Sequence, residues 1–269
     1  MERRVCQWTL GPGSPTALAL GSSPDKFCYY ICLMPVTIIP KLLDLLDQAP
    51  LFAGAGLAER KAALLAAQQS RLEKGAFYFH QGEEALAFYI VVEGRVRLTQ
   101  LTLEGHQIII RYLGAGEGMG IIVVLSNTIY PLSAEAVTDC TALKWDYEAT
   151  VQLMETFPRL ALNGLRLVAG RFQELQNRYR ELATERVERR VARTLLRLAR
   201  QTGRRTERGV LIDLPLSRQD LGEMTGTTLY TVSRILSNWE QQGLIETGRE
   251  RVTICNPHGL VVIAEDLPK

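Results

Sequence analysis

Residues 216–236, from Leu216 to Leu236, read LSRQDLGEMTGTTLYTVSRIL and decide the fold of this chain. The stretch predicts two short helices joined by a turn at Gly226. Ser217 is placed to cap the first helix, and Asp220, three residues later, can reach back to its amino end. The second helix is expected to begin at Thr227 or Thr228. It turns apolar side chains inward at three- and four-residue spacing, namely Val232, Ile235, Leu236 and Trp239.

This arrangement leaves polar and aromatic positions exposed near the start of the second helix, where a recognition helix reaches base edges and phosphates in a major groove. Helical hairpins with a glycine turn also occur as plain packing units in bundles. Residues 243–254 favour DNA binding over packing, because they predict two short strands around a turn carrying Gly248, with arginines at the tip. The pattern is that of a winged helix-turn-helix. Its candidate DNA-binding residues are Ser217, Arg218, Thr227, Thr228, Leu229, Tyr230, Ser233, Arg234, Arg249 and Arg251.

Composition places the rest of the chain. With 269 residues, 46% of them hydrophobic, the chain is long enough for more than one domain. The net charge of +2 is too small for a binder driven by overall charge. A local arginine cluster either contributes to DNA affinity or forms a solvated helix face: Arg186, Arg189, Arg190, Arg193, Arg197, Arg200, Arg204 and Arg205. No apolar run is long enough to span a bilayer, so we expect a cytoplasmic protein with no membrane partner.

The first third of the chain changes character twice. Residues 1–35 lack periodicity, and a well-patterned segment opens after Met34, so we hypothesise a disordered leader and a natural start at Met34. From Leu72 to about Tyr147, short β-branched and aromatic runs alternate with glycines, which predicts a compact antiparallel β roll or barrel. Glu93-Gly94 and Glu104-Gly105 are predicted hairpin turns, where glycine supplies a positive φ.

A long helix is predicted to connect the two ends. After Pro158, apolar residues recur at alternating intervals of three and four, which is an a/d seam: Leu165, Val168, Phe172, Leu175, Tyr179 and Leu182. The seam could pack on the chain's own β domain, but its length and its charged flanks favour a partner helix in a homodimer. A dimer would present two recognition helices to two half-sites about one helical turn apart. The predicted domains are a leader (1–35), a sensory β roll (36–156), a dimerisation helix (157–184) and a winged helix-turn-helix (185–269).

This order of elements resembles the Crp/Fnr family of bacterial transcription regulators over roughly residues 45–265. The matching segments are 79–83 (FHQGE), 88–94 (FYIVVEG), 113–117 (LGAGE), 189–196 and 217–245. The resemblance implies an α+β protein with an N-terminal jelly roll like that of cyclic-nucleotide-binding domains. It also implies no enzymatic activity, with promoter DNA, RNA polymerase and a second copy of the chain as partners.

The signal is addressed by departures from the family. In the branch that binds cyclic AMP, a glutamate holds the ribose and an arginine holds the cyclic phosphate, but here Ile121 and Leu132 occupy those places. An anionic phosphate without its guanidinium would be left partly unpaired, so we do not expect cyclic AMP.

In the Fnr branch, cysteines hold an iron–sulfur cluster. The five cysteines here, Cys6, Cys28, Cys32, Cys140 and Cys255, match that spacing poorly, and Leu143 stands nearer the internal ligand position than Cys140. The alternatives are a cluster and five ordinary reduced thiols.

Residues 226–234 and 256–261 resemble the Dnr and NnrR type, which responds to nitrogen oxides. In those regulators haem is the proposed nitric oxide sensor, so the resemblance makes haem the expected cofactor, with His80 and His106 as candidate ligands. A lone histidine on a strand or hairpin is more often structural. His258 lies in the DNA-binding end and is not a candidate. The signal we predict is redox or nitric oxide. An effector-independent regulator is the alternative.

Two further expectations concern specificity and class. Tyr230 stands where many family members carry a glutamate that accepts from a cytosine, so the half-site should depart from a TTGAT or TGTGA core. Arg234 should still contact guanine. An enzyme is the competing class, since Glu83, Glu84, Glu93, Asp139 and His106 could in principle supply an acid–base pair. No nucleophile elbow, Walker loop or metal-ligand repeat accompanies them, and the glycine-rich run 114–120 predicts a turn rather than a phosphate cradle. We therefore predict no catalytic and no metal site.

Overall fold

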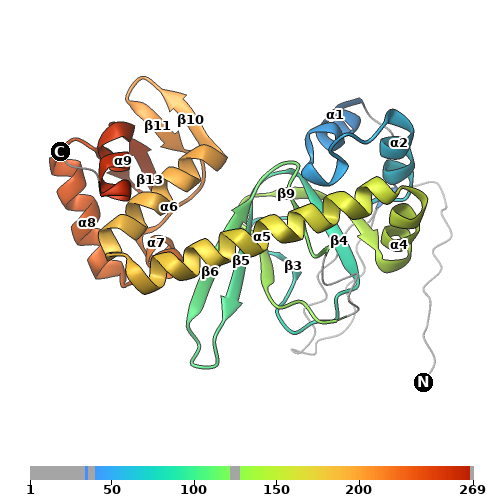
Figure 1. Cartoon of the computed structure of the whole chain (residues 1–269), viewed down its shortest axis with the longest axis horizontal. Coiled ribbons are helices and arrows are strands. Elements are labelled where there is room, and N and C mark those ends of the chain that lie inside the picture. Colours follow the sequence, from blue (N-terminus) through green and yellow to red (C-terminus); the bar gives the residue numbers. More distant parts are fainter. Residues whose placement is uncertain (1–33, 36–39, 122–127, 267–269) are drawn as a thin grey trace, which may run out of the picture. The chain divides into compact units, whose positions relative to one another are not determined.

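The computed structural model describes residues 34–35, 40–121 and 128–266 (Figure 1). The predicted leader lies outside these residues except for positions 34–35, as do Cys6, Cys28 and Cys32. The hypothesis of a start at Met34 is not tested by the structure.

Two antiparallel sheets form the N-terminal domain. One has the order β1 (Met34–Pro35), β2 (Gln68–Leu72), β9 (Cys140–Asp146), β4 (Ala87–Glu93) and β7 (Gly118–Met119). The other has the order β3 (Phe77–Phe79), β8 (Ser133–Ala136), β5 (Val96–Leu101) and β6 (Gln107–Leu113). Every pairing between these strands is antiparallel, which confirms the predicted β roll.

Short helices pack on the roll and close its core. They are α1 (Pro40–Gln48), the 3-10 turn η1 (Pro50–Phe52), α2 (Leu57–Leu65) and α4 (Tyr147–Thr156). Trp145 of β9 is fully buried, and its indole N–H donates to the carbonyl of Ala63 at 2.8 Å. Such a bond is expected of a buried indole, because an unpaired donor in an apolar core is costly.

The two predicted glycine turns have different outcomes. Gly105 (φ +82°) lies in a hairpin between β5 and β6, as predicted. Gly94 (φ +91°) also adopts the left-handed conformation, but the chain passes there from β4 in one sheet to β5 in the other. The predicted hairpin at Glu93-Gly94 is therefore wrong. A glycine with positive φ indicates a sharp change of direction, and it does not specify which strand the chain joins next.

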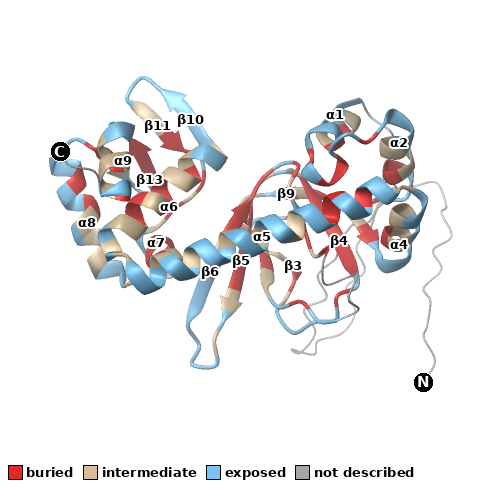
Figure 2. Cartoon of the chain, viewed as in Figure 1, coloured by how far each residue is buried: buried red, intermediate tan, exposed pale blue. Residues whose placement is uncertain are grey.

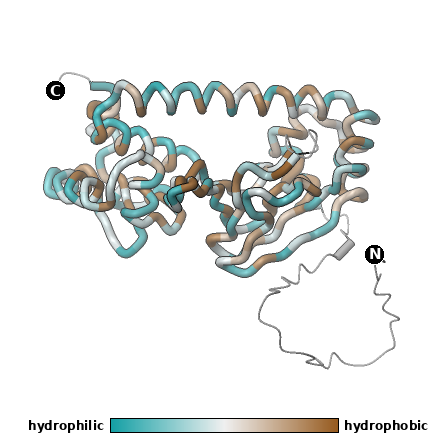
Figure 3. The backbone as a smooth tube through the Cα atoms, turned by 90° about the horizontal axis from the view of Figure 1, so that it is seen from below, coloured by the Kyte–Doolittle hydropathy of each residue, from teal (hydrophilic) through white to brown (hydrophobic). Residues whose placement is uncertain are grey.

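Helix α5 (Pro158–Thr184) follows the roll, and it begins at a proline in its first turn. Its first third is anchored by Asn163, whose Nδ2 donates to the carbonyls of Leu51 and Ala53 at 2.9 Å each. Beyond Gly164 the apolar side chains are largely exposed, as the pale surface of the helix shows (Figure 2). Apolar and polar segments alternate along it (Figure 3).

The C-terminal domain contains α6 (Val187–Thr202), α7 (Arg218–Thr225), α8 (Leu229–Gln241) and α9 (Pro257–Glu265). Its sheet has the order β10 (Gly203–Thr206), β11 (Gly209–Ile212), β13 (Arg251–Ile254) and β12 (Ile245–Gly248). Arg204 and Arg205 lie on β10, so the expectation that all eight arginines continue one helical pattern is wrong for these two. The α6 helix ends because Gly203 packs tightly: a Cβ there would lie 2.1 Å from the Ala199 carbonyl oxygen.

Candidate nucleic-acid interface

Helix α7 is capped as predicted. The Ser217 hydroxyl accepts from the backbone N–H of Asp220 at 3.0 Å, and the Asp220 carboxylate accepts from the backbone N–H of Ser217 at 2.8 Å. The helix ends at Gly226, which adopts a left-handed conformation (φ +61°). These contacts satisfy N–H groups that helices leave unpaired at their first turn, and they fix the angle between α7 and α8.

Helix α8 begins after Thr228, whose hydroxyl accepts from the backbone N–H of Thr231 at 3.2 Å. Val232, Leu236 and Trp239 are buried, which confirms the predicted inward face, and Ile235 is half-buried. The Trp239 indole donates to Glu188 at 3.0 Å. The opposite face presents Tyr230, which is 82% exposed, and the exposed Arg234. These two side chains therefore have the freedom to contact a ligand as large as duplex DNA.

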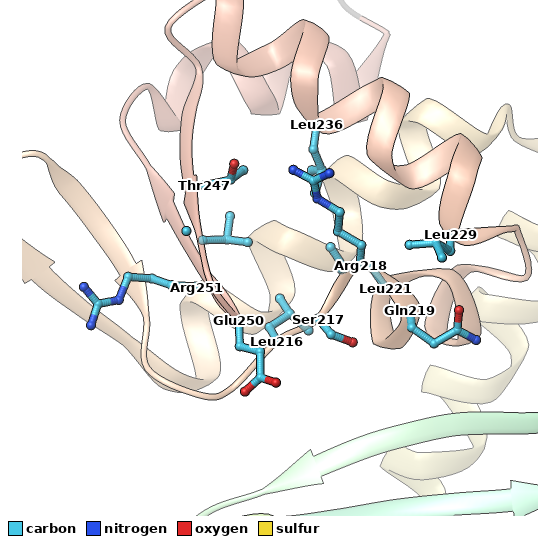
Figure 4. A pocket seen from close by; sticks show the side chains of 12 residues that line it. Leu216, Ser217, Arg218, Gln219, Leu221, Leu229, Leu236, Thr247, Glu250 and Arg251 are labelled. Atoms are coloured by element: carbon cyan, nitrogen blue, oxygen red, sulfur yellow. The ribbon is translucent and has the colours of Figure 1, made fainter.

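A groove of about 330 Å³ lies between the start of α7, helix α8 and the β12–β13 hairpin (Figure 4). Four of the ten predicted DNA-binding residues line it: Ser217, Arg218, Leu229 and Arg251. The Arg251 side chain points away from α8 (Figure 4). Gln219, Thr247 and Glu250 also line the groove and were not predicted. Their signal was available, because Gln219 follows Arg218 in the capped turn and Glu250 lies in the hairpin tip.

The other predicted residues lie outside this groove. Tyr230, Ser233 and Arg234 are on α8, and Thr227 and Thr228 form the turn before it. Arg249 lies in the hairpin turn, which consists of Arg249 and Glu250, and the positive φ of 51° belongs to Glu250. The prediction that Gly248 occupies the turn is therefore wrong by one residue, since Gly248 ends β12.

The arginines of α6 fit neither predicted role, because they make contacts within the chain. Arg190 donates to the carbonyls of Thr225 and Glu185 at 3.0 and 2.8 Å. Arg193 donates to the carbonyl of Ala264 at 3.1 Å and pairs with Glu185 at 3.2 Å. The side chains thus connect α6 to the ends of α5, α7 and α9, so α6 is a structural support of the winged helix-turn-helix.

The roll contacts α7 directly. Arg97 of β5 pairs with Glu135 of β8 at 2.7 Å and with Asp220 of α7 at 3.0 Å. Burial alone would lower the pKa of Arg97, but its hydrogen bond to Glu135 and the nearby negative charges raise it. The Gln107 amide donates to Glu223 at 3.3 Å. Three roll residues, Ile109, Tyr112 and Val137, belong to the apolar core of the C-terminal domain.

A second cavity, of about 600 Å³, lies between the roll, α5 and the start of the C-terminal domain. Its lining is mostly apolar and includes Ile121 and Leu132, the two residues that replace the cyclic-AMP contacts. Neither His80 nor His106 lines it. His80 stacks on Phe77 with ring centroids 4.3 Å apart, and His106 is exposed in the β5–β6 turn. The described residues therefore do not fit a haem held in this cavity by histidine, and haem stays a prediction.

The remaining candidate groups have structural contacts. Cys140 is buried, and its thiol donates to the Arg95 carbonyl at 3.1 Å. Burial raises the pKa of this thiol, which favours the neutral form over the thiolate that binds metals. Glu83 and Asp139 accept backbone N–H groups of His80 and Lys74. Within the described part of the chain, no three His, Cys, Asp or Glu side chains form a metal-binding group. No helix there is both long and apolar enough to cross a membrane.

The comparisons with known proteins agree with this architecture. Residues 69–157 match the model of the cyclic nucleotide-binding domain, and residues 189–263 match the Crp-like helix-turn-helix domain. The cyclic AMP receptor protein of Thermus thermophilus is 31% identical over 206 residues, 77% of this chain and 92% of the relative. The global nitrogen regulator of Synechococcus elongatus is 28% identical over 197 residues, 72% and 88% of the two chains.

The solved structure of FixK2 from Bradyrhizobium japonicum superimposes with a TM-score of 0.66 at 26% identity, covering 74% of this chain and 98% of that one. A cyclic-nucleotide-binding-like roll, a long helix and a helix-turn-helix with a wing define a DNA-binding transcription regulator. The chain belongs to the Crp/Fnr family.

Proposed function

We propose that this protein is a homodimeric regulator that binds a two-fold-symmetric operator through α8 and the β12–β13 hairpin, under the control of a small molecule bound in the roll. The observation that carries the proposal is the pairing of an exposed face on α8 with a groove bordered by the capped start of α7 and a basic hairpin. Backbone N–H groups and arginines at a helix start are suited to phosphates, and the exposed side chains of α8 are suited to base edges.

The a/d seam on α5 supports the dimer. Five of its six side chains are more than half exposed within one chain: Leu165, Phe172, Leu175, Tyr179 and Leu182. Val168 is half-buried. A row of apolar side chains on one helix is costly to leave in water, and a second copy of the helix would cover it. Recruitment of RNA polymerase by the DNA-bound dimer is part of the same proposal, and it rests on the family alone.

Selection of bound sequences from a random duplex library tests the proposal. The full chain should enrich an inverted repeat whose half-sites are about one helical turn apart, with a core different from TTGAT and TGTGA because of Tyr230. Recovery of no common sequence, or of a single unpaired half-site, would reject a symmetric dimeric reader.

Resemblance of residues 226–234 and 256–261 to the Dnr and NnrR type is the basis for nitric oxide or redox as the signal, through haem. An absorption spectrum of protein purified without oxygen, before and after addition of haem and nitric oxide, tests this part. A stoichiometric Soret band that shifts with nitric oxide would support it. A spectrum without any such band would reject it and leave an organic effector or effector-independent activity.

A further inference from the structure

The 600 Å³ cavity combines an apolar wall with one charged end. Phe79, Phe88, Leu98, Ile121 and Leu132 are among the residues of the apolar wall. At the charged end, Arg111 of β6 meets Glu174 and Arg178 of α5. A cavity of this volume falls within the range of about 300–1,000 Å³ that is usual for small-molecule sites, so its two-part lining bears on the ligand.

Arg111 is the deepest charge in the cavity, with 7% of the residue exposed. Its Nη2 pairs with Glu117 at 2.6 Å, while its Nη1 lies 3.9 Å from the nearest Glu174 oxygen. Among the described residues, neither its Nε nor its Nη1 has a hydrogen-bond partner. Buried N–H donors on a charged group are costly when unpaired, so this end of the cavity favours a ligand that brings an acceptor.

The surrounding arginines add to the surplus of donors. Arg178 donates to the Ile110 carbonyl and pairs with Glu174 at 3.1 Å, but its Nε is buried without a partner among the described residues. The same holds for the Nε of Arg197. Burial and the neighbouring charge of Arg178 lower the pKa of Arg197, which shows that the positive charges here are incompletely compensated.

We propose that the cavity binds an amphipathic monocarboxylate, whose carboxylate pairs with Arg111 and whose hydrocarbon body packs against the apolar wall. This rests on the proposed function, since it names the chemical class of the effector. A planar carboxylate matches a guanidinium edge through two parallel hydrogen bonds. One negative charge is the suitable number, because Glu117 and Glu174 already compensate most of the positive charge and a phosphate dianion would be repelled by both.

The probe is decanoate, with decanol and decylammonium as matched compounds that keep the chain and change only the head. Isothermal titration calorimetry of the full-length protein should give saturable binding of one decanoate per chain. Decanol should bind roughly tenfold to a hundredfold more weakly, because it lacks the charge-assisted pair with the guanidinium. Decylammonium should not bind measurably. Equal affinities for decanoate and decanol would overturn the proposal, because the cavity would then select only for apolar volume.

Two variants should change the affinity in opposite directions. Arg111→Gln should weaken decanoate binding by roughly tenfold or more. Glu174→Gln removes a negative charge 3.9 Å from Arg111 and keeps the side-chain shape, so it should tighten binding several-fold. A general loss of packing would weaken binding in both. Arg71→Gln, on an exposed position of β2 outside the cavity, is the control and should bind as the wild type does.

The result that would reject the site is decanoate binding that is absent, or unchanged in both the Arg111→Gln and the Glu174→Gln proteins. DNA binding is measured in parallel on the selected operator without decanoate, so the two proposals fail separately. Operator binding without decanoate binding would reject the ligand class and leave the regulator intact. Absence of operator binding under both conditions would reject the proposed function.

Discussion

The ion pair between Arg97 and Asp220 should couple the stability of the roll to that of the winged helix-turn-helix. We consider Arg97→Gln, Asp220→Asn and the double variant. The Arg97–Asp220 distance is 3.0 Å, with side chains 20% and 12% exposed. An asparagine at 220 keeps an oxygen that can accept from the Ser217 N–H, so it removes the charge while largely preserving the helix cap.

The magnitude follows from these contacts. A hydrogen bond to a charged group contributes about 1.5–3 kcal/mol net. The lower end applies here, because both side chains are partly exposed and because Arg97 keeps Glu135 at 2.7 Å when Asp220 is neutralised. We expect Asp220→Asn to cost about 1–2 kcal/mol and the double-mutant cycle to give a coupling energy of about 1 kcal/mol.

The assay is urea unfolding of the full-length protein followed by tryptophan fluorescence. Trp145 lies in the core of the roll and Trp239 in that of the C-terminal domain. Trp145→Phe and Trp239→Phe backgrounds therefore report on one domain each, and the remaining Trp8 is common to both. Arg97→Gln should lower the midpoint seen by Trp239, although Arg97 belongs to the roll. A matched cycle of Arg97 with Glu135 should affect mainly the transition seen by Trp145.

A coupling energy for Arg97 and Asp220 below about 0.3 kcal/mol would refute the reasoning, because that is the level at which independent sites are additive. It would mean that the contact between the roll and α7 is not formed in solution. A midpoint seen by Trp239 that is unchanged in Arg97→Gln would lead to the same conclusion.

Four further outcomes are expected. Arg234→Ala should cost about 1–3 kcal/mol of specific operator binding and relax selectivity at one guanine of each half-site, as titrations with substituted operators would show, and unchanged discrimination would contradict the guanine contact. Phe172→Glu should shift the protein from dimer to monomer in analytical ultracentrifugation, whereas Leu65→Glu, at an equally exposed position of α2, should not. Burial raises the pKa of Tyr112, so its neutral form stabilises the fold; stability should fall as the pH rises above about 10, the value of an unfolded tyrosine, and Tyr112→Phe should make the fall less steep in urea titrations at pH 9 to 11. Cys140 should react with a thiol reagent at pH 8 only in urea, and rapid labelling of Cys140 in the folded protein would contradict its burial.

The sequence predicted the parts of this fold that depend on neighbouring residues. Ser217 and Asp220 are three residues apart, and a capping box needs no information from elsewhere in the chain. The inward face of α8 follows in the same way from the helical period. The hairpin at Gly105 was predicted because β5 and β6 are adjacent in both sequence and space.

Features that depend on distant pairing could not be predicted. The chain at Gly94 has the same local signal as the chain at Gly105, yet β5 pairs with β8, which begins more than 30 residues later. The β10–β11 hairpin was missed because Arg204 and Arg205 continue the spacing of the α6 arginines, whereas Gly203 ends the helix. Arg97 and Asp220 are 123 positions apart, so no local pattern indicates that they meet.

The position of Asp220 connects the two ends of the molecule physically. One of its carboxylate oxygens caps the helix that borders the DNA-facing groove, and the other binds Arg97 of the roll. Strand β6 contributes both to the wall of the 600 Å³ cavity, through Arg111, and to the apolar contact with the C-terminal domain, through Ile109 and Tyr112. Glu223 of α7 lines the same cavity. A ligand that binds more tightly to one position of β6 must therefore favour one position of α7 as well, and the difference between those two affinities limits how far it can shift operator binding.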